Sequence, residues 1–212
     1  MSSVTNVYPM LHPPPEVRER GFPVERVASA FRGFLESLGL DFADPNLTGT
    51  PDRVARAYQE MLGGLRTAEP ALSTFPNAKK YRGIVSVTDI PFYSICAHHF
   101  LPFFGSVAVG YAPGESLVGL SKLARVVDFY ARRPQIQEDL TEQVASLLEE
   151  RLAPAGVIVS VEARHLCMEM RGVSRPGVTT RTTAVRGSLQ DERLQDQFFE
   201  RLGDGRAPNQ SR

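Results

Sequence analysis

Residues 157–171, VIVSVEARHLCMEMR, carry the pattern that is most informative about the fold. Apolar and polar side chains alternate here, which is typical of a β-strand with one face against a core. The turn SRPG follows, and residues 178–186 alternate in the same way, so the two stretches predict an antiparallel pair. If the alternation continues to the end of the first stretch, one strand face carries four polar or reactive side chains: His165, Cys167, Glu169 and Arg171.

Further strands and helices are expected on either side of this pair. Residues 81–89 and 103–111 have the pattern of strands. Helices are expected over 121–132 and 136–152, which a proline separates, and over 189–202. The order of these elements predicts an α+β fold, in which a four-stranded antiparallel sheet has two helices on one face.

The N-terminal part of the chain has a different character. An apolar stripe at helical spacing predicts a helix over 24–38. Thr50 followed by Pro51 predicts the start of a second helix, with Thr50 as its N-cap and Pro51 in its first turn. The chain therefore divides into four regions, which are a mobile arm over 1–15, a helical region over 16–65, the main domain over 66–202 and a flexible tail over 203–212.

Composition excludes several classes of protein. Lys and Arg together number 24, as do Asp and Glu, so the chain lacks the basic bias of nucleic-acid-binding proteins. No apolar run reaches the ~18 residues that suggest a membrane span, and the start, MSSVTNVYPM, does not resemble a secretory signal. We expect a cytoplasmic protein without a nucleic-acid or membrane partner, in which Cys96 and Cys167 are reduced.

Cysteine and histidine are concentrated in two short segments, 96–99 and 165–167. Zinc prefers thiolate and imidazole ligands in a tetrahedral shell. Cys96 and His99 are three residues apart and can face one point from a single turn, and Cys167 could supply a third ligand. Three ligands and an open position for water are typical of a catalytic Zn²⁺ site, where the metal lowers the pKa of that water toward about 7.

Spacing alone leaves other interpretations open. A buried cysteine packs in a core more often than it binds a metal, and C-x-x-H with one distant cysteine is a weak signal. A disulfide between Cys96 and Cys167 is a further alternative, which the reducing compartment disfavours. By themselves, the cations Lys122, Arg125 and Arg132 fit a solvated helix face better than a binding site.

Several stretches together closely resemble the type I GTP cyclohydrolase family. In chain order they are TPDRVARAY at 50–58, SICAHHFLPFFG at 94–105, VGLSKLARVVDFYARRPQIQEDLT at 118–141 and VEARHLCMEMRGV at 161–173. The resemblance extends over about residues 24–202, and the agreement of several independent motifs makes it specific. It implies the tunnelling fold, a toroidal homodecamer and active sites between subunits.

The resemblance also implies roles for individual residues, which fall into three groups. Cys96, His99 and Cys167 match the zinc ligands of the family. His98 and His165 match its catalytic histidines, and Ser121 matches a residue near the ribose that we expect to carry protons together with His98. The nucleotide contacts are matched by Gln137 and Glu138 for the guanine, by Lys122, Arg125 and Arg171 for the triphosphate, and by Arg53, which a neighbouring subunit supplies.

The reaction implied by the resemblance converts GTP and water to 7,8-dihydroneopterin triphosphate and formate.

Three positions depart from the family pattern: Ala97 replaces a usual glutamate, Asp139 a usual arginine and Arg181 a small polar residue. One hypothesis is that Asp139 and Arg181 pair and keep the local charge balanced. Another is a divergent paralogue that forms a different product from a guanine nucleotide. A non-catalytic, zinc-stabilised binding module is disfavoured, because the ligands and both histidines are present.

Overall fold

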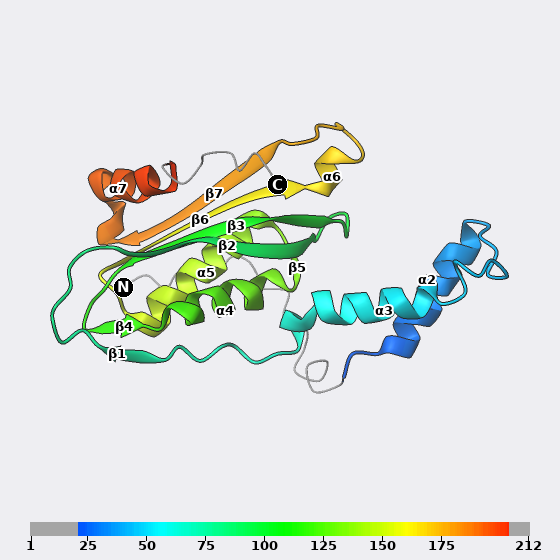
Figure 1. Ribbon diagram of the computed structural model, residues 1–212, viewed down its shortest axis with the longest axis horizontal. Helices are drawn as coiled ribbons and strands as arrows, with labels where there is room; N and C mark the ends of the chain where they lie inside the picture. Colours follow the sequence, from blue (N-terminus) through cyan, green and yellow to red (C-terminus); the bar gives the residue numbers. More distant parts are fainter. Residues whose placement is uncertain (1–20, 204–212) are drawn as a thin grey trace, which may run out of the picture. The chain divides into compact units, whose positions relative to one another are not determined.

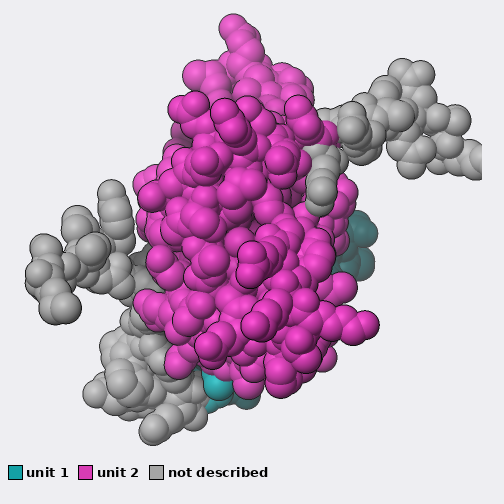
Figure 2. All heavy atoms as spheres, turned by 90° about the vertical axis from the view of Figure 1, so that its left-hand side faces the viewer, with its two compact units in different colours: residues 1–68 teal, residues 69–212 magenta. Residues whose placement is uncertain are grey.

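The computed structural model describes residues 21–203. Contacts within the chain divide it after Ala68 into a helical unit, residues 1–68, and a sheet unit, residues 69–212, which Figure 2 colours separately. The predicted arm over 1–15 lies outside the described residues, as does the predicted tail apart from its first residue. No helix within the described residues is long and apolar enough to cross a membrane.

Two helices that pack on each other form the helical unit, α2 (Val24–Ser37) and α3 (Thr50–Met61), followed by the short 3-10 turn η1 (Gly63–Leu65). Both helices were predicted at these places. The prediction that Thr50 is the N-cap of α3 is wrong, because Gly49 occupies that position. The Thr50 hydroxyl instead donates a hydrogen bond of 3.3 Å to the carbonyl of Asn46.

The sheet unit is built on a five-stranded sheet in the order β5-β2-β3-β6-β7 (Figure 1). Its four long strands, β2 (Val85–Cys96), β3 (Pro102–Ala112), β6 (Gly156–His165) and β7 (Thr179–Gly187), are antiparallel neighbours, as predicted. The predicted number of strands is wrong, because β5 (Pro134–Gln135) pairs in parallel with the end of β2. A separate two-stranded sheet joins β1 (Thr74–Pro76) and β4 (Ser116–Val118).

Strand β2 begins later and extends much further than the predicted strand over 81–89. A register shift between Val87 and Ile90, with Asp89 at a φ of 55°, marks a β-bulge through which the strand continues. Pro91 is tolerated beyond the bulge because β2 has a neighbour on only one side there. The bulge and the proline interrupt the alternation of apolar and polar residues, so the part of β2 beyond Val87 was not predicted as a strand.

Strand β6 is shorter than the predicted strand over 157–171. It ends at His165, and a single helical turn, α6 (Leu166–Glu169), follows it. The prediction that His165, Cys167, Glu169 and Arg171 share a strand face is therefore wrong. Cys167 is positioned by the turn α6 and not by the alternation of β6.

Helices cover both faces of the sheet (Figure 1). The predicted pair, α4 (Leu120–Ala131) and α5 (Gln137–Leu152), lies on one face, with α4 against β2 and α5 against β6 and β7. The core between them is apolar and fully buried, and includes Val107, Val109, Leu123, Val126, Leu140, Val144, Val159 and Val161. On the opposite face, η2 (Ser188–Gln190) and α7 (Glu192–Gly203) bring Leu189 and Phe198 against Ile158.

The contact between β3 and β6 requires a glycine at position 105, which yields a first prediction. A Cβ atom at Gly105 would come within 1.9 Å of the carbonyl oxygen of Glu162, so Gly105→Ala should lower the free energy of unfolding by about 3 kcal/mol. Urea denaturation measures the loss. Gly33→Ala in α2 is the control, since a Cβ there meets nothing within 4 Å and alanine favours a helix. Equal stability of the two variants would contradict the account.

Candidate functional site

The strand order brings the two cysteine-histidine segments to one end of the sheet. Both β2 and β6 are antiparallel to β3, so they run in the same direction and their C-terminal ends lie at the same end of the sheet. Cys96 is the last residue of β2 and His165 is the last residue of β6. Figure 1 shows β5 and α6 at this end, opposite the end where β1 and β4 pair.

Three of these side chains form a candidate metal centre. The ligand atoms of Cys96, His99 and Cys167 lie within 4.8 Å of one another, and Cys96 Sγ is 3.8 Å from His99 Nδ1. Zinc with bonds of about 2.3 Å to sulfur and about 2.05 Å to nitrogen would place such atoms about 3.6 Å apart in a tetrahedron. The residues therefore fit a zinc ion. Both thiols are free, so the alternative of a disulfide between the cysteines is wrong.

A tight turn presents the first two of these side chains, as predicted from their spacing. The Phe100 N–H donates to the Cys96 carbonyl at 2.8 Å and closes the turn directly after β2. The Ala97 N–H donates to the carbonyl of Gln135 at 2.9 Å, which ties the turn to β5. The short fifth strand therefore fixes the backbone on which Cys96 and His99 are carried.

An ion pair that the sequence analysis missed holds the turn that carries Cys167. Arg164 donates from Nε to Glu169 Oε1 at 2.8 Å and from Nη2 to Oε2 at 2.6 Å. The Glu169 side chain is only 8% exposed, and the Arg164 guanidinium holds the pKa of its carboxyl below the usual range. The two ends of the pair flank Cys167 in the sequence, so the pair closes a small loop around this ligand. Opposite charges five residues apart were the only signal of it.

Burial and the neighbouring cysteine act on the thiol of Cys167. Desolvation raises its pKa, and the closeness of Cys96 raises it further. Without a metal ion, the thiol of Cys167 therefore favours its protonated form, although the charge of Arg171 opposes the shift of its pKa. A bound divalent cation reverses this preference, because it stabilises both thiolates.

His165 is held by an aromatic ring and by a buried amide. Phe103 is its register partner on β3, and the two rings stack with centroids 4.8 Å apart and planes 2° from parallel. His165 Nε2 lies 2.7 Å from Oε1 of Gln137, the first residue of α5. Burial lowers the pKa of His165, and the charge of Glu138 opposes this shift. Phe103 was not predicted as part of the site, because the alternation of residues 103–111 indicates only that its side chain faces the core.

The remaining predicted residues at this end of the sheet are exposed. Arg171 Nη2 lies 3.2 Å from His99 Nε2, so a guanidinium contacts the candidate metal centre. The ring of His98 lies beside that of His99, with centroids 6.2 Å apart. Glu138 is exposed in the first turn of α5. An anion that approaches this end of the sheet therefore meets a cation and two imidazoles.

Other predicted site residues lie elsewhere in the chain. Ser121, Lys122 and Arg125 are in the first turns of α4, whose far end at Ala131 leads to β5 beside Cys96. At 1.5 Å per residue, Ser121 is about 15 Å along the helix from that end. Arg53 belongs to the helical unit and donates to the Asn46 carbonyl at 3.1 Å and to the Thr50 hydroxyl at 2.9 Å.

Two of the three departures from the family pattern, Arg181 and Asp139, lie on β7 and in α5. Arg181 pairs with Glu162, its register partner on β6, through a bond of 3.1 Å from Nε. The hypothesis of a pair between Asp139 and Arg181 is therefore wrong. Burial raises the pKa of Asp139, and the nearby charges of Glu138 and Glu142 add to the shift.

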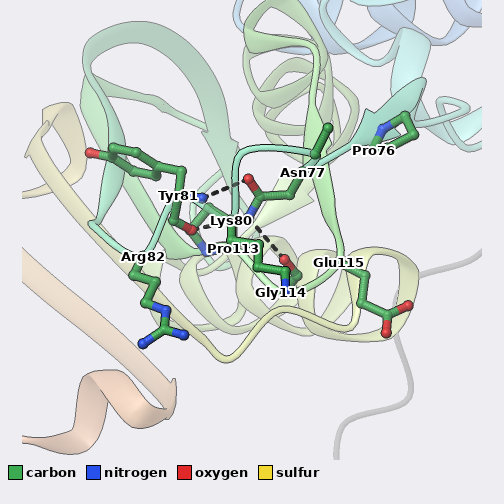
Figure 3. A pocket seen from close by; sticks show the side chains of 9 residues that line it. Pro76, Asn77, Lys80, Tyr81, Arg82, Pro113, Gly114 and Glu115 are labelled. Atoms are coloured by element: carbon green, nitrogen blue, oxygen red, sulfur yellow. Dashed lines mark hydrogen bonds between the residues drawn. The ribbon is translucent and has the colours of Figure 1, made fainter.

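A cavity of about 380 Å³ lies at the opposite end of β2, around the loop before Val85 (Figure 3). Asn77 closes this loop: its Nδ2 donates to the carbonyls of Tyr81 and Gly114 at 3.0 Å and 3.1 Å, and its Oδ1 accepts from the Tyr81 N–H at 2.8 Å. The amide is thus used by the loop itself. The cavity shares no residue with the candidate metal centre.

Comparison with known proteins gives consistent matches. The profile described as GTP cyclohydrolase I matches residues 27–203. The protein named GTP cyclohydrolase 1 in Thermobifida fusca (strain YX) is 51% identical over 174 residues, which cover 81% of this chain and 84% of that protein. Proteins of the same name from Mycobacterium marinum and Mycobacterium tuberculosis are 47% and 48% identical, over 82% and 80% of this chain and 87% and 85% of their own lengths.

Among solved structures, the apo archaeosine synthase QueF-Like is similar with a TM-score of 0.42 and 21% sequence identity. The alignment covers 51% of this chain and 98% of that chain.

Removal of a thiol ligand tests the candidate metal centre. Cys167→Ala leaves Cys96 and His99 as two of the three donors, so we expect the purified protein to lose its zinc on dialysis against a mild chelator. Elemental analysis measures the metal per chain. Met168→Leu, in the same turn, is the control and should retain the metal. Equal zinc content in both variants would refute the assignment of Cys167.

The ion pair around Cys167 provides a separate test. Arg164→Met should weaken zinc binding by about 10- to 100-fold, because the turn with Cys167 loses the contact that orients it. Competition with a chromogenic chelator measures the affinity. Arg151→Met removes a more exposed ion pair with Glu69, at 2.7 Å, far from the cysteines in the sequence, and should leave zinc affinity unchanged. A similar loss in both variants would mean that the effect is not specific to the turn.

Proposed function

This chain belongs to the GTP cyclohydrolase I family, and we propose that it converts GTP and water to 7,8-dihydroneopterin triphosphate and formate. The cluster of Cys96, His99 and Cys167 beside a stacked histidine carries this proposal. Zinc is the metal that this donor set fits, and when bound it supplies a Lewis acid that activates water at neutral pH. The observed spacing of the sulfur and nitrogen ligands supports the choice of metal.

Water opens the purine at the bond between C8 and N9, which leaves C8 as a formyl group on N7. A second water cleaves the C8–N7 bond, so that C8 leaves as formate, and the later ring closure returns one water. His165 exchanges a proton with N7 of the purine, which makes C8 more electrophilic. Its fixed ring supports this role, because Phe103 and Gln137 hold it on two sides. His98 and Ser121 carry protons in the later steps, in which the ribose opens, rearranges and closes into the dihydropterin ring.

Glu138 holds the guanine in this proposal, together with its neighbour Gln137. A carboxylate can accept two hydrogen bonds, one from the guanine N1–H and one from the 2-amino group. The exposed position of Glu138 in the first turn of α5, next to the residue that contacts His165, supports this role. The guanine would then lie close to the histidine that acts on its N7.

The triphosphate is bound by Lys122, Arg125 and Arg171, with Arg53 from a neighbouring subunit. Guanidinium groups suit phosphate oxygens because they can donate two parallel hydrogen bonds. Along α4, Ser121 lies about 15 Å and Arg125 about 9 Å from the end beside the metal centre. This separation supports a homodecamer with active sites between subunits and the tunnelling fold that the family is expected to share.

In this proposal, residues 66–202 form the tunnelling-fold cyclohydrolase domain and residues 16–65 its helical extension. An arm over 1–15 and a tail over 203–212 complete the division. We place the protein in the cytosol, because the proposed ligands must stay reduced to bind zinc. The balance of 24 basic and 24 acidic residues supports a nucleotide as partner in preference to a nucleic acid.

The products identify the reaction. Zinc-loaded protein incubated with GTP should release one formate for each dihydroneopterin triphosphate formed, measured by mass spectrometry and a formate assay. His165→Gln should reduce formate release by about 10²- to 10⁴-fold, since general acid-base catalysis is lost. A ring-opened nucleotide that never closes would replace the proposal with a divergent paralogue, redirected by Ala97, Asp139 or Arg181. Unchanged GTP with bound zinc would indicate a binding module.

A further inference from the structure

The Gln137 amide has four hydrogen-bond partners, and one of them is Nε2 of His165. These contacts determine which ring nitrogen of His165 holds the proton. The Gln137 side chain is fully buried, with the residue only 2% exposed. We propose that Gln137 is a positioning residue that keeps a proton on Nε2 of His165 at all times, so that Nδ1 is the nitrogen that exchanges protons with the substrate. This inference rests on the proposed catalytic role of His165 and adds to Gln137 a role other than contact with the guanine.

The orientation of the Gln137 amide follows from its partners. One end of the amide lies 3.0 Å from the carbonyl oxygen of Val161 and 2.9 Å from that of Thr180. Carbonyl oxygens only accept hydrogen bonds, so this end must be the NH₂ group. The flipped amide would point an oxygen at two other oxygens in a buried place, which is costly. Oε1 therefore faces His165.

The orientation of the amide then determines the state of the imidazole. Oε1 of Gln137 lies 2.7 Å from Nε2 of His165 and can only accept. Nε2 must therefore donate, both when the ring is neutral and when it is charged. In the neutral ring the lone pair is left on Nδ1. Phe103 stacks flat on the same ring and opposes a rotation that would exchange the two nitrogens.

Thr141 and Thr182 complete the hydrogen-bond network around Gln137, and their hydroxyls can donate and accept in a way that agrees with this amide orientation. The Thr141 hydroxyl donates to the Gln137 carbonyl at 2.8 Å, so its oxygen is left to accept from Thr182 Oγ1 at 2.6 Å. Having given its hydrogen to Thr141, Thr182 Oγ1 can accept a share of one of the two Gln137 Nε2 hydrogens, at 3.2 Å. Each donor in the chain thus has an acceptor, and no alternative arrangement of the amide satisfies all of them.

The network restricts what Gln137 can do for a bound guanine. Both of its N–H groups are used within the chain, and one lone pair of Oε1 is used by His165. A single lone pair is left for a substrate N–H, whereas Glu138 has a whole exposed carboxylate. Loss of the Gln137 amide should therefore affect proton transfer at His165 more than nucleotide affinity.

The tautomer can be observed directly. In zinc-loaded protein labelled with ¹⁵N at its four histidines, solid-state NMR distinguishes a protonated from an unprotonated ring nitrogen, and the signals absent from His165→Gln belong to that residue. We expect a protonated Nε2 and an unprotonated Nδ1 in the neutral ring. Gln137→Met should give a mixture of tautomers. Gln143→Met, on the same helix and in contact with Gln135, is the matched control and should leave the tautomer as in the wild type.

Kinetics separate positioning from binding. Gln137→Met should lower kcat for formate release about 100-fold while KM changes less than about threefold. A raised KM with an unchanged kcat would mean that Gln137 only holds the guanine, and would overturn the proposal. An NMR spectrum of the wild-type protein in which His165 is protonated on Nδ1 alone would also overturn the proposal, and this measurement needs no variant. The NMR result needs no turnover, so failure of the wild type to release formate would reject the proposed function and leave the tautomer assignment standing.

Discussion

The site depends on the two antiparallel ladders of β3. Because β2 and β6 both pair with β3, their C-terminal ends reach the same end of the sheet, and Cys96 meets the segment that carries Cys167. The register matters as much as the order, because a slip of one residue would turn every side chain of a strand to the other face. In the observed register Phe103 lies opposite His165. The close approach of Gly105 to β6 is part of the same ladder.

The polar groups around this end of the sheet are oriented by contacts within the chain, before any ligand arrives. Glu169 is held by Arg164, the amide of Gln137 by two backbone carbonyls, and the ring of His165 by Gln137 and Phe103. Such groups need little reorganisation when charge develops during a reaction, which is how preorganised sites lower barriers. A substitution that removes one partner of these buried contacts should therefore be costly, because it leaves a buried polar group unpaired.

The sequence predicted the features that depend on local spacing. C-x-x-H places Cys96 and His99 on one turn, and alternation indicated the four long strands, with wrong bounds for β2 and for the end of β6. Features that depend on a distant partner were not predictable. Alternation could not show that α6 replaces the strand after His165, nor that Arg181 faces Glu162 on β6 and not Asp139. The short parallel strand β5 has too few residues to produce any period.

The predicted triphosphate contacts come from several separate segments of the chain, and this distribution has a physical rationale. A triphosphate requires several positive charges close together, and in a single folded chain those charges would repel one another whenever the nucleotide is absent. Here the start of α4 carries Lys122 and Arg125, while Arg171 lies beside His99 and Arg53 belongs to the helical unit. If neighbouring subunits complete the site, as proposed, each chain can fold before these charges are brought together. In that proposed assembly the nucleotide would stabilise the association, because it would bind only where the charges of neighbouring subunits meet.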